Sequence, residues 1–156
     1  MPNVAGKLTK NQDVAFLLLR IGVGVIMVAH GTMKLSDPAG TAAQFAQIGI
    51  PLPSAAVVLA IAGEFLGGLG LLLGALTRVA ALGPLCTMIV AIATVHAGNG
   101  LFTQNGGWEY PLTILLVSLA FVFRGAGRYS LDAWLRRRQH PQLRQAAKYP
   151  DPAAAA

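Results

Sequence analysis

Charged residues and cysteines are both scarce in this 156-residue chain. Asp, Glu, Lys and Arg make up 12% of it, whereas a soluble domain averages about 25%. Cys86 is the single cysteine, so neither an internal disulfide nor a self-contained dithiol redox centre can form. The CxxCH and HExxH patterns of haem and zinc sites are also missing. We therefore expect neither a disulfide scaffold nor a bound metal.

Acidic residues are fewer than basic ones, 6 against 12, and the net charge is +6. The basic residues cluster towards the chain ends and are not interleaved with aromatic residues, as they are in nucleic-acid-binding proteins. We therefore expect no nucleic-acid partner. The first apolar run is about 22 residues, too long for a signal peptide, and no small-x-small cleavage site follows it.

Apolar residues, in contrast, make up 54% of the chain. Four apolar segments, residues 14–35, 55–76, 79–95 and 108–124, have about the length that crosses a bilayer core as a helix. Backbone groups in lipid must be hydrogen-bonded internally, so these segments are predicted to be helices. The sequence thus predicts an all-α integral membrane four-helix bundle at residues 14–126. A cytoplasmic N-terminus at residues 1–13 precedes it, and a basic cytoplasmic tail at residues 127–156 follows it.

The orientation is predicted from the basic residues. Ten of the twelve lie on one side of the predicted membrane: Lys7, Lys10, Arg78, Arg124, Arg128, Arg136, Arg137, Arg138, Arg144 and Lys148. The positive-inside rule puts that side, and both termini, in the cytoplasm.

Two segments outside the spans are predicted to be interfacial helices. Residues 40–51 form the first, in the first outer loop, with Thr41 as N-cap and Gly49 as its stop. Residues 130–138 form the second, an amphipathic helix on the cytoplasmic leaflet. Ser130 caps this helix, and its arginines lie behind the apolar face that carries Trp134.

Six ionisable residues lie within or beside the predicted spans, where a charge is costly and usually functional. At 1.5 Å per residue, five of them converge on the outer half of the membrane: His30, Lys34, Glu64, His96 and Glu109. Arg20 lies deeper, about 8 Å from Glu64 along the membrane normal, and we predict that Arg20 and Glu64 form an ion pair. For Lys34 alone we favour snorkelling to the outer headgroups. The alternative for His96 and Glu109 is solvation at helix ends.

Glycines recur at four-residue spacing in the second span, as the pairs Gly63 and Gly67, and Gly70 and Gly74. This spacing lets two helices approach closely. We predict tight packing of this glycine face, either within the bundle or between copies of the chain in a homo-oligomer.

Several segments, including LLLRIGVGVIMVAHGTMKL, AGTAAQFAQIGIPLP, AGEFLGGLGLLLGALTRVAAL, GGWEYPL and GRYSLD, resemble the DoxX family in order and spacing. The resemblance covers about residues 14–132 and implies a four-helix protein of the bacterial cytoplasmic membrane. Its recurring polar positions would be Arg20, His30, Gly31, Lys34, Gly63, Glu64, Arg78, His96 and Glu109. The family also implies redox chemistry at the membrane, with quinone as a candidate cofactor and a soluble or membrane redox protein as a candidate partner.

Three hypotheses about function follow. The chain is a membrane subunit or accessory factor of a quinone- or thiol-linked redox system, in which His30 and Glu64 handle protons in a polar cavity. Alternatively, the same cavity serves small-molecule binding or transport, or the chain is a structural scaffold without catalysis. A haem or metal site on His30 and His96 is weaker, because these residues differ in depth by about 7–9 Å.

Overall fold

A computed structural model of the chain describes residues 4–139, with side chains from residue 11 onward. The predicted tail beyond residue 139 lies outside this part. Every regular element within the described residues is a helix. In chain order they are α1 (Val4–Ser36), α2 (Pro38–Gln47), α3 (Pro53–Ile61), η1 (Ala62–Leu66), α4 (Gly67–Leu73), α5 (Thr77–Ala80), α6 (Leu82–Ala91), η2 (Ile92–His96), η3 (Ala97–Asn99), η4 (Thr103–Asn105), α7 (Glu109–Arg124) and α8 (Leu131–Gln139).

Three helical stretches are long and apolar enough to cross a membrane: Asn11–Ser36, Pro53–Leu73 and Thr77–Asn99. They overlap the first three predicted spans. However, α1 begins at Val4, so the predicted boundary at residue 13 falls inside one continuous helix. α7 occupies the fourth predicted span and has 16 residues. That is about 24 Å of helix, shorter than the roughly 30 Å hydrocarbon core of a bilayer.

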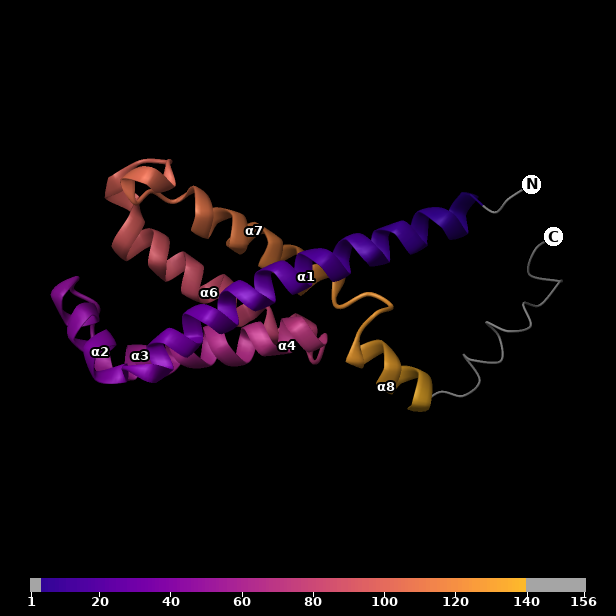
Figure 1. The fold of residues 1–156 in the computed structure, drawn as a ribbon, viewed down its shortest axis with the longest axis horizontal. Coiled ribbons are helices and arrows are strands. Elements are labelled where there is room, and N and C mark those ends of the chain that lie inside the picture. The colour runs from indigo at the N-terminus through magenta and orange to yellow at the C-terminus, as the bar shows by residue number, and fades with distance from the viewer. Residues whose placement is uncertain (1–3, 140–156) are drawn as a thin grey trace.

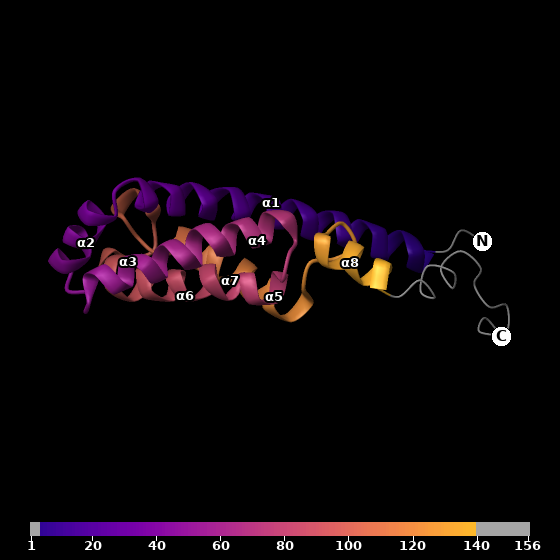
Figure 2. The same ribbon diagram turned by 90° about the horizontal axis from the view of Figure 1, so that it is seen from below.

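The long helices lie side by side along the length of the molecule (Figures 1 and 2). α1 packs along the α3–η1–α4 segment, which packs on α6, and α6 packs on α7. α1 and α7 touch less extensively; one contact between them is the edge-to-face pair of Phe16 and Phe121, with ring centroids 5.9 Å apart. The core between the helices includes Met27, Leu71 and Phe121, which are fully buried.

Large apolar side chains also cover the outside of the molecule. Leu59, Leu76 and Phe123 are 71%, 74% and 75% exposed. A soluble monomer rarely exposes contiguous apolar patches above a few hundred Å², whereas lipid tails solvate leucine about as well as a protein core does. The chain therefore turns a lipid-compatible surface outward.

The helix α2, in the connection between α1 and α3, begins earlier than predicted. Asp37, rather than Thr41, is its N-cap, because Asp37 Oδ1 accepts a hydrogen bond from the Gly40 N–H at 2.8 Å. Pro38 follows at the first helical position, where the missing N–H costs little. Thr41 lies inside the helix and donates its hydroxyl to the Asp37 carbonyl. Gly49 comes just after the helix with φ +78°, a conformation that glycine adopts without strain.

Candidate functional site

The side chains of Lys34 and Glu64 meet between α1 and η1. Lys34 Nζ donates a hydrogen bond to Glu64 Oε2 at 2.5 Å. The Lys34 side chain is 20% exposed and that of Glu64 is 7% exposed, so the pair is largely withdrawn from the surface. The snorkelling that we favoured for Lys34 is therefore wrong, because its ammonium group turns towards a carboxylate within the bundle.

Gly31 brings α1 close enough for this pair to form. A Cβ atom at Gly31 would lie 2.7 Å from the Cα of Phe65, the residue after Glu64. No real Cβ atom makes so short a contact with backbone. The absence of a side chain at Gly31 thus lets α1 lie directly against the backbone of η1, one turn from Lys34.

Glu64 and His96 both lie in π-helical turns. η1 (Ala62–Leu66) contains Glu64, and η2 (Ile92–His96) ends at His96. A π-turn adds one residue to a helical turn, and such turns are rare and frequently found at functional sites. Two of the predicted site residues therefore lie in this unusual backbone geometry.

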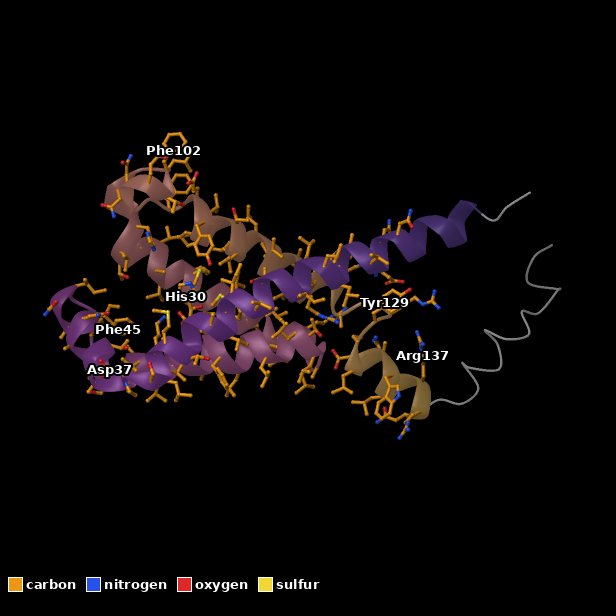
Figure 3. The ribbon with its side chains drawn as sticks, viewed as in Figure 1. His30, Asp37, Phe45, Phe102, Tyr129 and Arg137 are labelled. Carbon is orange, nitrogen blue, oxygen red and sulfur yellow. The ribbon has the colours of Figure 1, made fainter. Side chains whose placement is uncertain are left out.

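His30 lies on the same face of α1 as Lys34, one turn earlier. Its ring is tilted against that of Tyr110 on α7, with centroids 6.4 Å apart. Figure 3 shows His30 on α1, well away from Tyr129 and Arg137 near the opposite end of the molecule. The structure thus places His30, Lys34 and Glu64 in the same half of the bundle, with Tyr110 beside His30.

His96 and Glu109, in contrast, hold the loop between η2 and α7. His96 Nδ1 lies 2.6 Å from the carbonyl oxygen of Gly106, and since a carbonyl only accepts, Nδ1 donates. Glu109 Oε1 accepts the backbone N–H of Thr103 at 2.6 Å. Both side chains are thus engaged by this loop rather than by Lys34 or Glu64.

Arg20 does not pair with Glu64, contrary to our prediction. It is 2% exposed and donates from one terminal nitrogen to the Ala126 carbonyl at 2.8 Å and from the other to the Tyr129 carbonyl at 2.6 Å. Helix side chains lean towards the N-terminus of their helix, which for α1 is away from Glu64. By the same rule, the Lys34 side chain points back along α1 towards Glu64. The segment that carries Glu64 runs antiparallel to α1, so the Glu64 side chain points towards Lys34.

A second polar cluster therefore forms around Arg20, near the start of α8. Asp132 accepts hydrogen bonds from the N–H of Leu76 at 2.8 Å, and from the N–H and hydroxyl of Thr77 at 3.0 Å each. Its own N–H donates to the Gly74 carbonyl at 2.9 Å. We call these contacts the Asp132 anchor, since they tie α8 to the turn that precedes α5.

The charge on Asp132 is favoured by this anchor. Burial raises the pKa of its carboxyl, but the hydrogen bonds from Thr77 and Leu76 and the charge of Arg136 together lower the pKa below its ordinary value. Asp13 is likewise bonded to backbone: it is buried and accepts the N–H of Arg128 at 3.2 Å. The sequence analysis assigned no role to either aspartate.

The glycine face of the α3–η1–α4 segment packs against other parts of the same chain. Cβ atoms at Gly63, Gly67 and Gly70 would clash with Thr87, Pro84 and Ala80 respectively, which lie in α5 and α6. Gly74 has φ +66° and faces the guanidinium of Arg20 and Ser130 instead. These four glycines therefore allow close packing inside one chain.

Two hollows in the structure are apolar. One, of about 300 Å³, lies between α2 and α3 and is lined mainly by Ala42, Val57, Val58 and Ile61. The other, of about 420 Å³, lies between α4 and α5–α6. Neither is lined by Lys34 or Glu64. Within the described residues no three His, Cys, Asp or Glu side chains are grouped so as to hold a metal ion.

Taken together, the fold and these contacts define a small helical membrane protein that buries a lysine–glutamate pair between two apolar helices. The chain belongs to the DoxX family, whose sequence model matches residues 15–97. The sequence resemblance to that family is thereby confirmed.

Similar proteins are known from several bacteria. A protein of Bacillus subtilis (strain 168) named "Putative oxidoreductase CatD" is 33% identical over 82% of this chain and 92% of its own length. An uncharacterized protein of Haemophilus influenzae is 35% identical over 80% of this chain and 93% of its own length. The Escherichia coli (strain K12) "Inner membrane protein YqjF" is 29% identical over 83% of this chain and 98% of its own length. No solved structure matches the chain significantly.

Proposed function

We propose that this protein is a membrane subunit or accessory factor of a quinone- or thiol-linked redox system. His30 and the Lys34–Glu64 pair are its proton-handling site. In this proposal α7 is the fourth span, both termini lie in the cytoplasm, and the protein is in the bacterial inner membrane. Local thinning of the bilayer accommodates the short α7. The names of the Escherichia coli and Bacillus subtilis relatives support the location and the redox role.

The observation that carries the proposal is the largely buried ion pair between Lys34 on α1 and Glu64 in a π-turn. Reduction of a quinone to a quinol takes up two electrons, which the partner redox protein would supply, and two protons, which the hydrocarbon around the protein cannot supply. An ammonium group has three N–H donors, and one of those on Lys34 is directed at Glu64. The others suit a carbonyl oxygen of a bound quinone. His30 lies one turn away and carries an imidazole, the side chain that most often acts as a general acid or base in proteins.

A structural scaffold is the alternative that a specific observation favours. Arg20, Asp13 and Asp132 all bond to backbone groups, which is what a role in holding the fold requires. In this alternative the Lys34–Glu64 pair likewise only joins α1 to η1, and no ligand binds beside it.

Quinone content of the purified protein tests the proposal. The wild type would be purified in mild detergent, extracted with organic solvent and analysed by mass spectrometry, beside Glu64→Gln and the matched control Glu109→Gln. We expect near-stoichiometric quinone in the wild type and in Glu109→Gln, and its loss in Glu64→Gln. Equal quinone retention in all three would remove the role of Glu64. Absence of quinone from all three, with Glu64→Gln less stable than the wild type, would favour the scaffold.

A further inference from the structure

Six arginines gather at the end of the molecule where α8 begins. Arg78 is in α5, Arg124 ends α7, Arg128 follows in the α7–α8 connection, and Arg136, Arg137 and Arg138 are in α8. All six are exposed. We call them, with the exposed Trp134, the arginine platform. Figure 1 shows α8 beyond the ends of α4 and α7, and Figure 3 shows Arg137 on α8.

The acidic residues nearby do not neutralise the platform. Asp13 is buried against the backbone of Arg128, with the Arg128 side chain 4.0 Å away, and Asp132 is taken up by the Asp132 anchor. Within the described part of the chain, the side chains of Arg78, Arg124, Arg137 and Arg138 make no ion pair with a carboxylate. Their charge is therefore available to an anionic partner.

The platform is held in a fixed place by buried bonds. The Asp132 anchor joins the first turn of α8 to Leu76 and Thr77. Arg20 holds the segment that leads into α8, through its bonds to the carbonyls of Ala126 and Tyr129. The arginines of α8 therefore occupy a set position relative to the apolar helices.

That position is at the border of the lipid-facing surface. Arg78 is followed by the exposed Val79, and Arg124 is preceded by the exposed Phe123. On α8 itself Leu131, Trp134 and Leu135 are exposed, and the Arg138 guanidinium lies 4.0 Å from the centre of the Trp134 ring. Aromatic and basic side chains next to an apolar belt are typical of the level of lipid headgroups. A soluble acidic partner would account for the arginines but not for the apolar residues between them.

We propose that the arginine platform binds anionic phospholipid headgroups, with the guanidinium groups on the phosphates and Trp134 at the headgroup boundary. Guanidinium pairs with phosphate through two parallel hydrogen bonds. The Asp132 anchor is the positioning element, since it sets α8 at the depth where both contacts form. This proposal is independent of the redox role, because it concerns the opposite end of the molecule from Lys34 and Glu64.

Quenching of Trp134 fluorescence by bromine-labelled lipid tests the proposal. The chain has two tryptophans, so Trp108→Phe leaves Trp134 as the sole reporter in the full-length protein in mild detergent. Brominated phosphatidylglycerol and brominated phosphatidylcholine would be titrated separately. We expect phosphatidylglycerol to quench at much lower concentration. A basic residue near an anionic surface contributes about 5-fold in affinity, so Arg136, Arg137 and Arg138 together contribute on the order of 100-fold.

Two sets of variants separate charge from position. The triple change of Arg136, Arg137 and Arg138 to Gln should abolish the preference for phosphatidylglycerol, and the matched triple change to Lys should keep most of it. Asp132→Asn retains every arginine but weakens the anchor, so it should reduce the preference. Retention of phosphatidylglycerol by the unmodified protein, counted by native mass spectrometry, checks the result without any substitution. Equal quenching and equal retention of the two lipids would overturn the proposal and leave an acidic protein as the partner.

Discussion

Removing the charge of Lys34 should destabilise the protein substantially, and Lys34→Met is the sharpest way to do so. Methionine keeps an unbranched side chain of similar length but leaves Glu64, which is 7% exposed, without a partner. Removing one member of a buried ion pair typically costs 3–5 kcal/mol. Because the Lys34 side chain is still 20% exposed, we expect the lower end of that range, about 3 kcal/mol.

The Glu64→Gln and double variants show whether this loss comes from the pair itself. Glu64→Gln keeps a hydrogen-bond acceptor but removes the charge, so we expect a loss of about 2 kcal/mol. If the two side chains act on each other, Lys34→Met with Glu64→Gln should lose about 3 kcal/mol, less than the sum of the single variants by about 2 kcal/mol. Snorkelling of Lys34 to the headgroups would instead make the two changes additive.

Reversible unfolding by SDS in mixed micelles, followed by tryptophan fluorescence, measures these free energies. Glu109→Gln is the matched control, since it removes a carboxylate that bonds to the loop between η2 and α7. We expect it to change the free energy of unfolding by less than about 1 kcal/mol. A Lys34→Met protein as stable as the wild type, or strictly additive losses in the double variant, would refute the pairing.

Two further predictions follow from other contacts. Gly31→Ala should lower the free energy of unfolding by about 1–3 kcal/mol, because the new Cβ meets the backbone of Phe65. The control is Gly22→Ala in the same helix, where nothing lies within 4 Å of the new Cβ. In the same SDS unfolding assay this change should be neutral or stabilising by up to about 1 kcal/mol. Equal losses of stability in the two variants would refute the close approach at Gly31. The pKa of Asp132 is lowered from its ordinary value of 3.8, so its anchor should be fully formed above that pH and be lost as the pH falls below it. The fluorescence anisotropy of Trp134 in the Trp108→Phe background should therefore be constant from pH 7 to about 4 and fall at lower pH. In Asp132→Asn the anisotropy should be low at every pH. An anisotropy that does not change down to about pH 2–3 would contradict the anchor.

The helical segments could be predicted from the sequence because their apolar length is itself the physical requirement for crossing a bilayer. The π-turns at Glu64 and His96 could not, because they add a residue without any change in the apolar pattern. The roles of Asp13 and Asp132 also depend on contacts between residues far apart in the chain, as in the bond from Arg128 N–H to Asp13. Such pairings are set by the packing of whole helices and leave no local signal.

The pairing predicted for Arg20 is wrong, because its guanidinium bonds to the carbonyls of Ala126 and Tyr129 rather than to Glu64. Depth was counted from Cα positions, and Arg20 and Glu64 then seemed within reach of each other. Adding the lean of helix side chains towards the N-terminus separates Arg20 from Glu64 and brings Lys34 to it. This correction needs only the direction of each helix, so it could have been made from the sequence.

The two polar clusters differ in the kind of partner that each charge has. Arg20, Asp13 and Asp132 bond to carbonyl or N–H groups of the backbone, which neither titrate nor rotate away, so changing their charge would break the connection to α8. Lys34 and Glu64 bond to each other through side chains, which can turn towards a ligand without moving the backbone. We therefore assign the proposed proton-coupled chemistry to Lys34 and Glu64, and the cluster around Arg20 to the architecture that positions the arginine platform.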